Sequence, residues 1–196
     1  MRIYRSRSVA ALRAVILVTG YTTGPMSKPM SPEQALQIAE AQRHRFNELV
    51  DVFDTPQPPE VMARLEEIVV SACLSPGEVV LDVGAGAGVL IPLIENYRPS
   101  AVLACDLAEK MLERVIQKHP TVRTLRGDIA LLSLPSGSVD VIFMNAVYGN
   151  IADKPRACQG KSRAMYPAGS GVANQELCGN PNQTSNAPVL HPCKPS

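Results

Sequence analysis

The sequence contains no tryptophan, and only 4% of its 196 residues are aromatic. This composition gives no support for a platform of aromatic side chains on which nucleic-acid bases would stack. The formal net charge is +1, so electrostatic attraction makes no case for nucleic acid or an anionic membrane as the main partner. We therefore expect a single domain with one core and a partner of another kind.

Long apolar runs and paired cysteines are also missing. The best apolar run covers residues 14–18, far short of the roughly 20 residues that cross a bilayer. The odd, scattered set of cysteines predicts free thiols in a reducing compartment and no metal site. These cysteines are Cys73, Cys105, Cys158, Cys178 and Cys193.

Acidic residues are absent from the first 32 positions, and the first one is Glu33. The same stretch carries several arginines, serines and alanines, a composition typical of an organelle transit peptide. The alternative is a disordered basic leader or translated upstream sequence. We expect residues 1–30 to be a leader. The protein would then be cytoplasmic, or located in a mitochondrion or plastid if the leader is a transit peptide.

Residues 31–74 are predicted to form an amino-terminal helical cap. Ser31 can cap a helix, Pro32 suits its first turn, and Gln34 stands where a capping box places it. Prolines between residues 55 and 59 end this helix, and a second helix is expected from about residue 60 to 73. The first helix should bury one apolar face, formed by Leu36, Ala39, Phe46, Leu49, Val50 and Phe53.

Strand-like and helical patterns alternate from residue 78 onward. Strands are expected at residues 78–82, 101–105, 121–125 and 138–144, and helices at 89–96 and 109–118. Such alternation predicts an α/β fold whose parallel strands are joined by right-handed crossovers. The continuously apolar strands fit a sheet that is covered on both faces.

A glycine-rich turn connects the first of these strands to the helix that follows it. It reads Asp82-Val-Gly84-Ala85-Gly86-Ala-Gly88. Glycines allow a ligand to approach the backbone closely because they carry no Cβ. Open α/β sheets bind ligands at the carboxyl ends of their strands, which is where this turn lies. The alternative is a plain tight turn between strand and helix.

Polar residues also follow the other three strands. Asp106 ends the second strand, where its carboxylate could accept hydrogen bonds from two ribose hydroxyls. Asp128 follows the third strand, and Asn145 follows the fourth. Each has an alternative explanation, since Asp106 could cap a helix, Asp128 could belong to a turn and Asn145 could merely end a strand. Polar or glycine-rich positions at four successive strand ends nevertheless favour one shared binding crevice.

Residues 79–157 resemble the Rossmann-like class I S-adenosylmethionine-dependent methyltransferases. Within them the similarity is greatest to the type 11 group, which includes the ubiquinone and menaquinone biosynthesis methyltransferases. The matching segments are Leu81-Asp-Val-Gly-Ala-Gly-Ala-Gly88, Cys105-Asp-Leu-Ala-Glu-Lys-Met-Leu112, Gly127-Asp-Ile-Ala-Leu-Leu-Ser-Leu-Pro135 and Ser138-Val-Asp-Val-Ile-Phe-Met-Asn145. Together they indicate S-adenosylmethionine as the cofactor and say little about the methyl acceptor, for which a small molecule is expected.

The resemblance also implies roles for individual residues. Gly84, Ala85, Gly86 and Gly88 would form the loop under the methionine and ribose parts of the cofactor, and Asp82 would hold that loop or the amino group. Asp106 would bind the ribose hydroxyls and Asp128 the adenine amino group. Leu107, Met111 and Ile129 would pack beside the adenine, and Asn145 would complete the cofactor site.

No catalytic residue follows from the sequence, because methyl transfer needs a base only when the acceptor must lose a proton. Tyr148 could approach the substrate. His44, on the first predicted helix, is the best candidate for a general base by residue type, although we favour a surface histidine without a catalytic role at that position.

The family sheet normally has seven strands, yet the helical and strand patterns stop after residue 157. We therefore expect a core at residues 75–157 with strand order 3-2-1-4, lacking the fifth to seventh strands, and an irregular tail at residues 158–196. The fourth strand would then expose an apolar edge open to self-association.

Two alternatives to an active methyltransferase stay open. The chain could be a non-catalytic, truncated methyltransferase fold that arises from splicing or from a gene-model error. It could also be an NAD-dependent dehydrogenase, although Val89 then occupies the position of the third glycine in G-x-G-x-x-G.

Overall fold

The computed structural model describes residues 2–4, 16–18, 31–154 and 156–157. The predicted tail at residues 158–196 and most of the predicted leader lie outside these residues. Two short strands inside the leader, β1 (Arg2–Tyr4) and β2 (Ile16–Val18), pair antiparallel, which the sequence did not predict. No helix in the described part of the chain is long and apolar enough to cross a membrane.

The centre of the fold is a four-stranded parallel sheet built from β3 (Val79–Val83), β4 (Ala101–Asp106), β5 (Arg123–Arg126) and β6 (Val141–Phe143). The strands are ordered β5-β4-β3-β6, which confirms the predicted order 3-2-1-4. Leu81 at the centre pairs in register with Leu103 on one side and Ile142 on the other. The carboxyl ends of all four strands therefore meet at one edge of the sheet.

Alternate side chains of the strands enter two separate layers, as the pleat of a sheet requires. Val80, Ala104 and Phe143 pack in one cluster with the helices α3 (Pro59–Ser71), α4 (Ile91–Glu95) and α5 (Glu109–Lys118). Leu81 and Ile142 point to the opposite face, which is covered by loop residues such as Ile129 and Ile151. Helices thus cover one face of the sheet, and segments that follow β5 and β6 cover the other.

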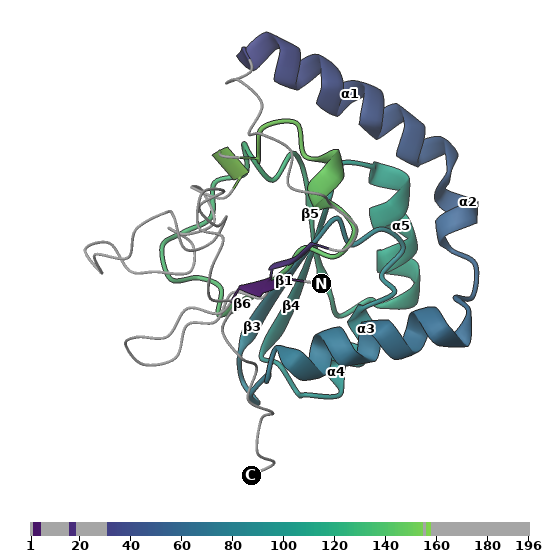
Figure 1. The fold of residues 1–196 in the computed structure, drawn as a ribbon, viewed down its shortest axis with the longest axis vertical. Helices are drawn as coiled ribbons and strands as arrows, with labels where there is room; N and C mark the ends of the chain where they lie inside the picture. The colour runs from purple at the N-terminus through teal and green to yellow at the C-terminus, as the bar shows by residue number, and fades with distance from the viewer. Residues whose placement is uncertain (1, 5–15, 19–30, 155, 158–196) are drawn as a thin grey trace.

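The helical cap begins as the sequence predicts. In α1 (Pro32–Glu48) the Gln34 amide donates to Ser31 Oγ at 3.2 Å, and the Ser31 amide donates to Gln34 Oε1 at 3.2 Å. The expected apolar face of this helix is wrong at Leu36, which is 61% exposed, and at Phe53, which is 46% exposed and lies beyond the end of α1. Figure 1 shows the reason for Leu36, since the first turns of α1 extend beyond the edge of the domain while its second half joins α2 (Val50–Phe53) beside α5.

Polar contacts join the cap to α5, and we call this set of contacts the cap seam. Arg43 Nη1 donates to Glu109 Oε1 at 2.6 Å, and the Lys110 amide donates to Asn47 Oδ1 at 3.0 Å. The Arg43 guanidinium, followed by a bond from Asn47, lowers the pKa of Glu109 to about 2. The seam continues along α5 through Arg114 to Asp51 and Lys118 to Asp54.

Two details differ from the sequence-based expectations. Cys73 is disulfide-bonded, so the expectation of free thiols is wrong at this position. The fourth strand is shorter than the predicted residues 138–144, since β6 covers only Val141–Phe143; just before it, the Asp140 carboxylate accepts a hydrogen bond from the Val79 amide at 2.8 Å and the Asp140 amide donates to the Val79 carbonyl at 2.9 Å. Among the described residues, no strand forms backbone hydrogen bonds with the outer edge of β6, so self-association through that edge stays a prediction.

Asn47 should contribute measurably to the stability of the fold, because it caps α5 across a gap of 63 positions in the sequence. We expect Asn47→Ala to lower the free energy of unfolding by ~1 kcal/mol, the usual effect of losing a helix cap. Urea denaturation monitored by circular dichroism measures this change. Glu48→Ala, at the exposed neighbouring position, is the control and should change stability by less than ~0.5 kcal/mol. Equal effects of the two substitutions would contradict the capping role.

Candidate active site

The glycine turn after β3 is in the left-handed backbone region at two positions that line a cavity. Gly84 has φ +68° and Gly86 has φ +53°. A Cβ at Gly84 would lie 2.3 Å from Cγ2 of Val147, whereas a Cβ at Gly86 would meet nothing within 4 Å. The turn is therefore closed by Val147 at its first glycine and open to the cavity at its second.

The third glycine of the turn has a different role. A Cβ at Gly88 would lie 2.8 Å from Cδ1 of Ile91 and 3.3 Å from Cγ2 of Val115. Gly88 therefore permits close packing of α4 and α5 and is not among the residues that line the cavity. The expectation that it lies directly under a ligand does not match this position.

Asp82 is also placed behind the cavity and not on its surface. It pairs in register with Ala104 and Phe143, so its side chain belongs to the face of the sheet that the helices cover. It is 2% exposed, and among the described residues no group donates a hydrogen bond to its Oδ2. Burial, with a smaller contribution from the negative charge of Asp106, raises its pKa to about 7.

Asp106 is the polar group that organises the site. Its Oδ2 accepts a hydrogen bond from the Gly86 amide at 2.9 Å, and its Oδ1 accepts one from the Ala108 amide at 2.9 Å. Burial raises the pKa of this carboxyl group above its ordinary value, and the bonds from Ala108, Gly86 and Leu107 oppose that shift. The side chain thus both fixes the turn next to the start of α5 and lines the cavity.

Asp128 similarly combines the two roles that the sequence left open. Its Oδ1 accepts a hydrogen bond from the Ala130 amide at 2.8 Å, and its carbonyl accepts from Leu131 and Leu132 at 2.9 Å. These bonds make a tight turn after β5. The turn also brings Asp128 and the neighbouring Ile129 to the wall of the cavity.

The cavity has a volume of about 360 Å³. It contains most of the site residues predicted from the sequence, namely Gly84, Ala85, Gly86, Asp106, Leu107, Met111, Asp128, Ile129 and Asn145. Asp106 and Asp128 are the only charged side chains among the described residues that line it, and both are acidic. The cavity therefore favours a neutral or positively charged ligand.

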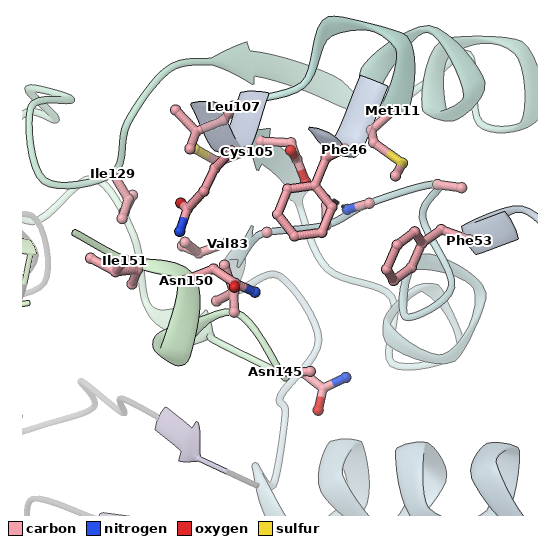
Figure 2. Close-up of a pocket in the computed structure, with 18 of the residues that line it drawn as sticks. Phe46, Phe53, Val83, Cys105, Leu107, Met111, Ile129, Asn145, Asn150 and Ile151 are labelled. Carbon is pink, nitrogen blue, oxygen red and sulfur yellow. Dashed lines mark hydrogen bonds between the residues drawn. The ribbon is translucent and has the colours of Figure 1, made fainter. Parts of the chain in front are cut away.

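The predicted helical cap supplies a wall of the cavity, through residues that the sequence analysis did not assign to the site. Ala39, Gln42 and Phe46 on α1 and Phe53 on α2 line it. The Phe46 and Phe53 rings meet edge to face with centroids 5.7 Å apart, and Figure 2 shows them on the side opposite Ile129 and Ile151. Their helical spacing was visible in the sequence but indicated only a core-facing side.

Of the two residues considered for a role with the substrate, His44 lies outside the cavity lining. Its side chain is 67% exposed and its Nε2 lies 3.1 Å from Glu40 Oε1, which fits the surface histidine favoured above. Tyr148 begins the 3₁₀ turn η1 (Tyr148–Asn150), but its side chain is not among those that the structure describes.

The two cavity-lining glycines provide a matched test of the turn. Each has a positive φ, so alanine at either position adds a similar backbone strain. Only Gly84→Ala also overlaps Val147. We expect Gly84→Ala to destabilise the protein by ~1–3 kcal/mol more than Gly86→Ala, the usual penalty for overpacking. Urea denaturation of both variants measures this difference, and equal losses would show that Val147 does not close the turn.

The buried Asp82 carboxyl predicts an unusual dependence of stability on pH. Its pKa is raised from the ordinary 3.8 to about 7 in the folded chain, so the folded state binds the proton more tightly. The free energy of unfolding should therefore fall as the pH rises from about 4 to about 7. Asp82→Asn cannot lose a proton and should exceed the unsubstituted protein in stability at pH 8, by up to ~4 kcal/mol for roughly three pKa units.

Urea denaturation at half-unit pH steps measures this effect. Glu67→Gln, at an exposed position of α3, serves as the control and should follow the unsubstituted protein. Parallel curves for Asp82→Asn and the unsubstituted protein between pH 4 and 8 would contradict the raised pKa.

Comparison with known proteins adds independent evidence. Residues 81–173 match the model of a family described as a methyltransferase domain, and this match reaches past residue 157, where the resemblance in the sequence ended. A malonyl-[acyl-carrier protein] O-methyltransferase from Halorhodospira halophila is 32% identical over 135 residues, which are 67% of this chain and 44% of that protein. The biotin biosynthesis bifunctional protein BioHC from Cellvibrio japonicus is 33% identical over 90 residues, or 45% of this chain and 18% of that protein.

A solved structure shows the same fold. The phosphoethanolamine N-methyltransferase 1 of Haemonchus contortus, in complex with phosphoethanolamine and S-adenosylhomocysteine, superposes with a TM-score of 0.55 at 19% identity. The superposition covers 67% of this chain and 31% of that one. This chain spans less than half the length of the curated relatives it matches. The domain match, the relatives and the strand order agree, and together they support a class I S-adenosylmethionine-dependent methyltransferase.

Proposed function

We propose that this chain binds S-adenosylmethionine in the cavity at the carboxyl edge of the sheet and takes part in transferring its methyl group to a small acceptor. The observation that carries the proposal is the position of Asp106. Its carboxylate ends β4, lines the cavity and is held beside the open backbone of Gly86. A nucleoside with two ribose hydroxyls finds both acceptor oxygens and room for close approach at this point.

The other cavity residues fit the remaining parts of such a cofactor. Asp128 offers a carboxylate oxygen to the adenine amino group, while Leu107, Met111 and Ile129 offer apolar surface to the ring. Asn145 lies apart from them at the other end of the labelled side chains in Figure 2, where it can contact the methionine part or the acceptor. The acidic lining also suits a cofactor that carries a positive charge on sulfur.

When bound, the cofactor supplies an activated methyl group on sulfur, so the chemistry of the donor is its own. The chain contributes orientation and exclusion of water. Asp106 and Asp128 fix the nucleoside end, and the cap with Phe46 and Phe53 covers the cavity from above. Alignment of donor and acceptor can by itself account for much of the rate increase. We assign no general base to the described residues.

The names of the relatives support a small acceptor group. One is named for a malonyl group that is carried on acyl-carrier protein, and the other for biotin biosynthesis. We therefore propose a small-molecule acceptor and leave the methylated atom open. Because this chain spans 44% of the first relative, a methyltransferase fold without turnover of its own is the second candidate. The proposal leaves the compartment open between the cytoplasm and, if residues 1–30 are a transit peptide, an organelle. It includes self-association through the edge of β6.

A binding measurement tests the proposal directly. Calorimetric titration with S-adenosylhomocysteine should show saturable binding by the unsubstituted protein. Asp106→Ala removes both acceptor oxygens and should weaken binding more than tenfold, which corresponds to about 1.4 kcal/mol. Glu67→Ala, at an exposed position on α3 that does not line the cavity, is the control and should bind normally. A protein that is folded by circular dichroism and does not bind S-adenosylhomocysteine would refute the proposed function.

A further inference from the structure

Gln42 carries an unsatisfied polar atom at the cavity. The residue lines the cavity from α1, and its Oε1 is buried. Among the described residues, no group donates a hydrogen bond to this oxygen. A buried carbonyl without a donor is unfavourable, so its presence in a residue that lines a cavity calls for a partner, and a bound ligand can supply one.

The position of Gln42 is fixed by the cap seam. The next residue, Arg43, is bonded to Glu109 at 2.6 Å, and Asn47 receives the Lys110 amide at 3.0 Å. Both contacts lie at the start of α5, just after Asp106 and Leu107. The seam therefore holds the turn of α1 that carries Gln42 above the junction of β4 and α5, where Asp106 enters the same cavity.

We propose that Gln42 is a ligand-binding residue that accepts a hydrogen bond from the nucleoside part of the cofactor. A nucleoside at the junction of β4 and α5 presents hydroxyl and amino donors, and Gln42 Oε1 is an acceptor. Asp106 would accept hydrogen bonds from the nucleoside on the sheet side of the cavity, and Gln42 would accept one on the cap side. This assignment rests on the proposed function, because it presumes that the cavity holds S-adenosylmethionine.

The arrangement couples the position of the cap to occupancy of the cavity. Without a ligand donor, this position of the cap is disfavoured, because the buried Gln42 carbonyl has lost water without gaining a donor. A bound nucleoside supplies the donor and removes that disadvantage. The ligand therefore stabilises the closed cap, in the sense that it interacts more favourably with that state than with an open one.

Replacement of Gln42 by leucine separates this role from a structural one. Leucine keeps an apolar side chain of similar size and removes the unsatisfied carbonyl. We expect Gln42→Leu to melt at the same temperature as the unsubstituted protein, or higher, when no ligand is present. Gln37→Leu makes the same chemical change at an exposed position of the same helix that does not line the cavity, and it serves as the matched control.

Two probe ligands show which part of the cofactor Gln42 contacts. The binding of each probe is measured by calorimetry and by the shift of the melting temperature. S-adenosylhomocysteine contains the nucleoside and the amino-acid part, whereas methylthioadenosine lacks the amino-acid part. We expect Gln42→Leu to weaken both by the same factor, about 3- to 10-fold for one hydrogen bond. Gln37→Leu should bind both probes as the unsubstituted protein does.

The possible outcomes separate this inference from the proposed function. Unchanged affinity of Gln42→Leu for S-adenosylhomocysteine, in a protein whose unsubstituted form binds it, would overturn the role of Gln42 and leave the proposed function intact. Weaker binding of S-adenosylhomocysteine alone would overturn the assignment to the nucleoside. A lower melting temperature without ligand would show that Gln42 serves the fold. Absence of binding by the unsubstituted protein would overturn both proposals.

Discussion

The carboxylate of Asp106 is the constraint on which the site depends. Its two oxygens accept hydrogen bonds from the Gly86 and Ala108 amides, so one side chain joins the turn after β3 to the start of α5. Hydrogen bonds to a charged acceptor are stronger than neutral ones. They keep the turn ordered although glycine can adopt many backbone conformations. The same bonds direct a carboxylate into the cavity and oppose the rise of its pKa on burial.

The cap depends in turn on the helix that Asp106 begins. Arg43 and Asn47 bind residues in the first turn of α5, so the wall above the cavity is positioned from the same point as the wall below it. These contacts are polar and partly exposed, and exposed ion pairs contribute little to stability. The cap is also attached by an apolar cluster, in which Phe46 and Val50 pack with Ala87, Ala108 and Met111. Polar and apolar contacts together therefore hold the cap to the glycine turn and to α5.

The features that could be predicted from the sequence are mainly those that depend on residues close together in the chain. The capping box of Ser31 and the bounds of α5 follow from spacing between near neighbours in the chain, whereas the strand order follows from the family resemblance; the structure confirms all three. Features that depend on distant pairs were not predictable. Asn47 meets Lys110 across 63 positions, and Gly88 serves helix packing because Ile91 and Val115 converge on it. Leu36 has the apolar spacing of a helix face, but this spacing does not show which turns of the helix are covered by the core, and Leu36 is exposed.

The sheet side and the cap side of the cavity differ in whether their polar atoms have hydrogen-bond partners within the described residues. On the sheet side, Asp106 and Asp128 already hold backbone amides in the ligand-free chain, so their geometry is set before a ligand arrives. Such preorganisation lowers the free energy needed to bind. On the cap side, Gln42 holds an oxygen that no described group satisfies. The sheet side therefore fixes where a ligand can bind, and the cap side offers an acceptor that a ligand could satisfy.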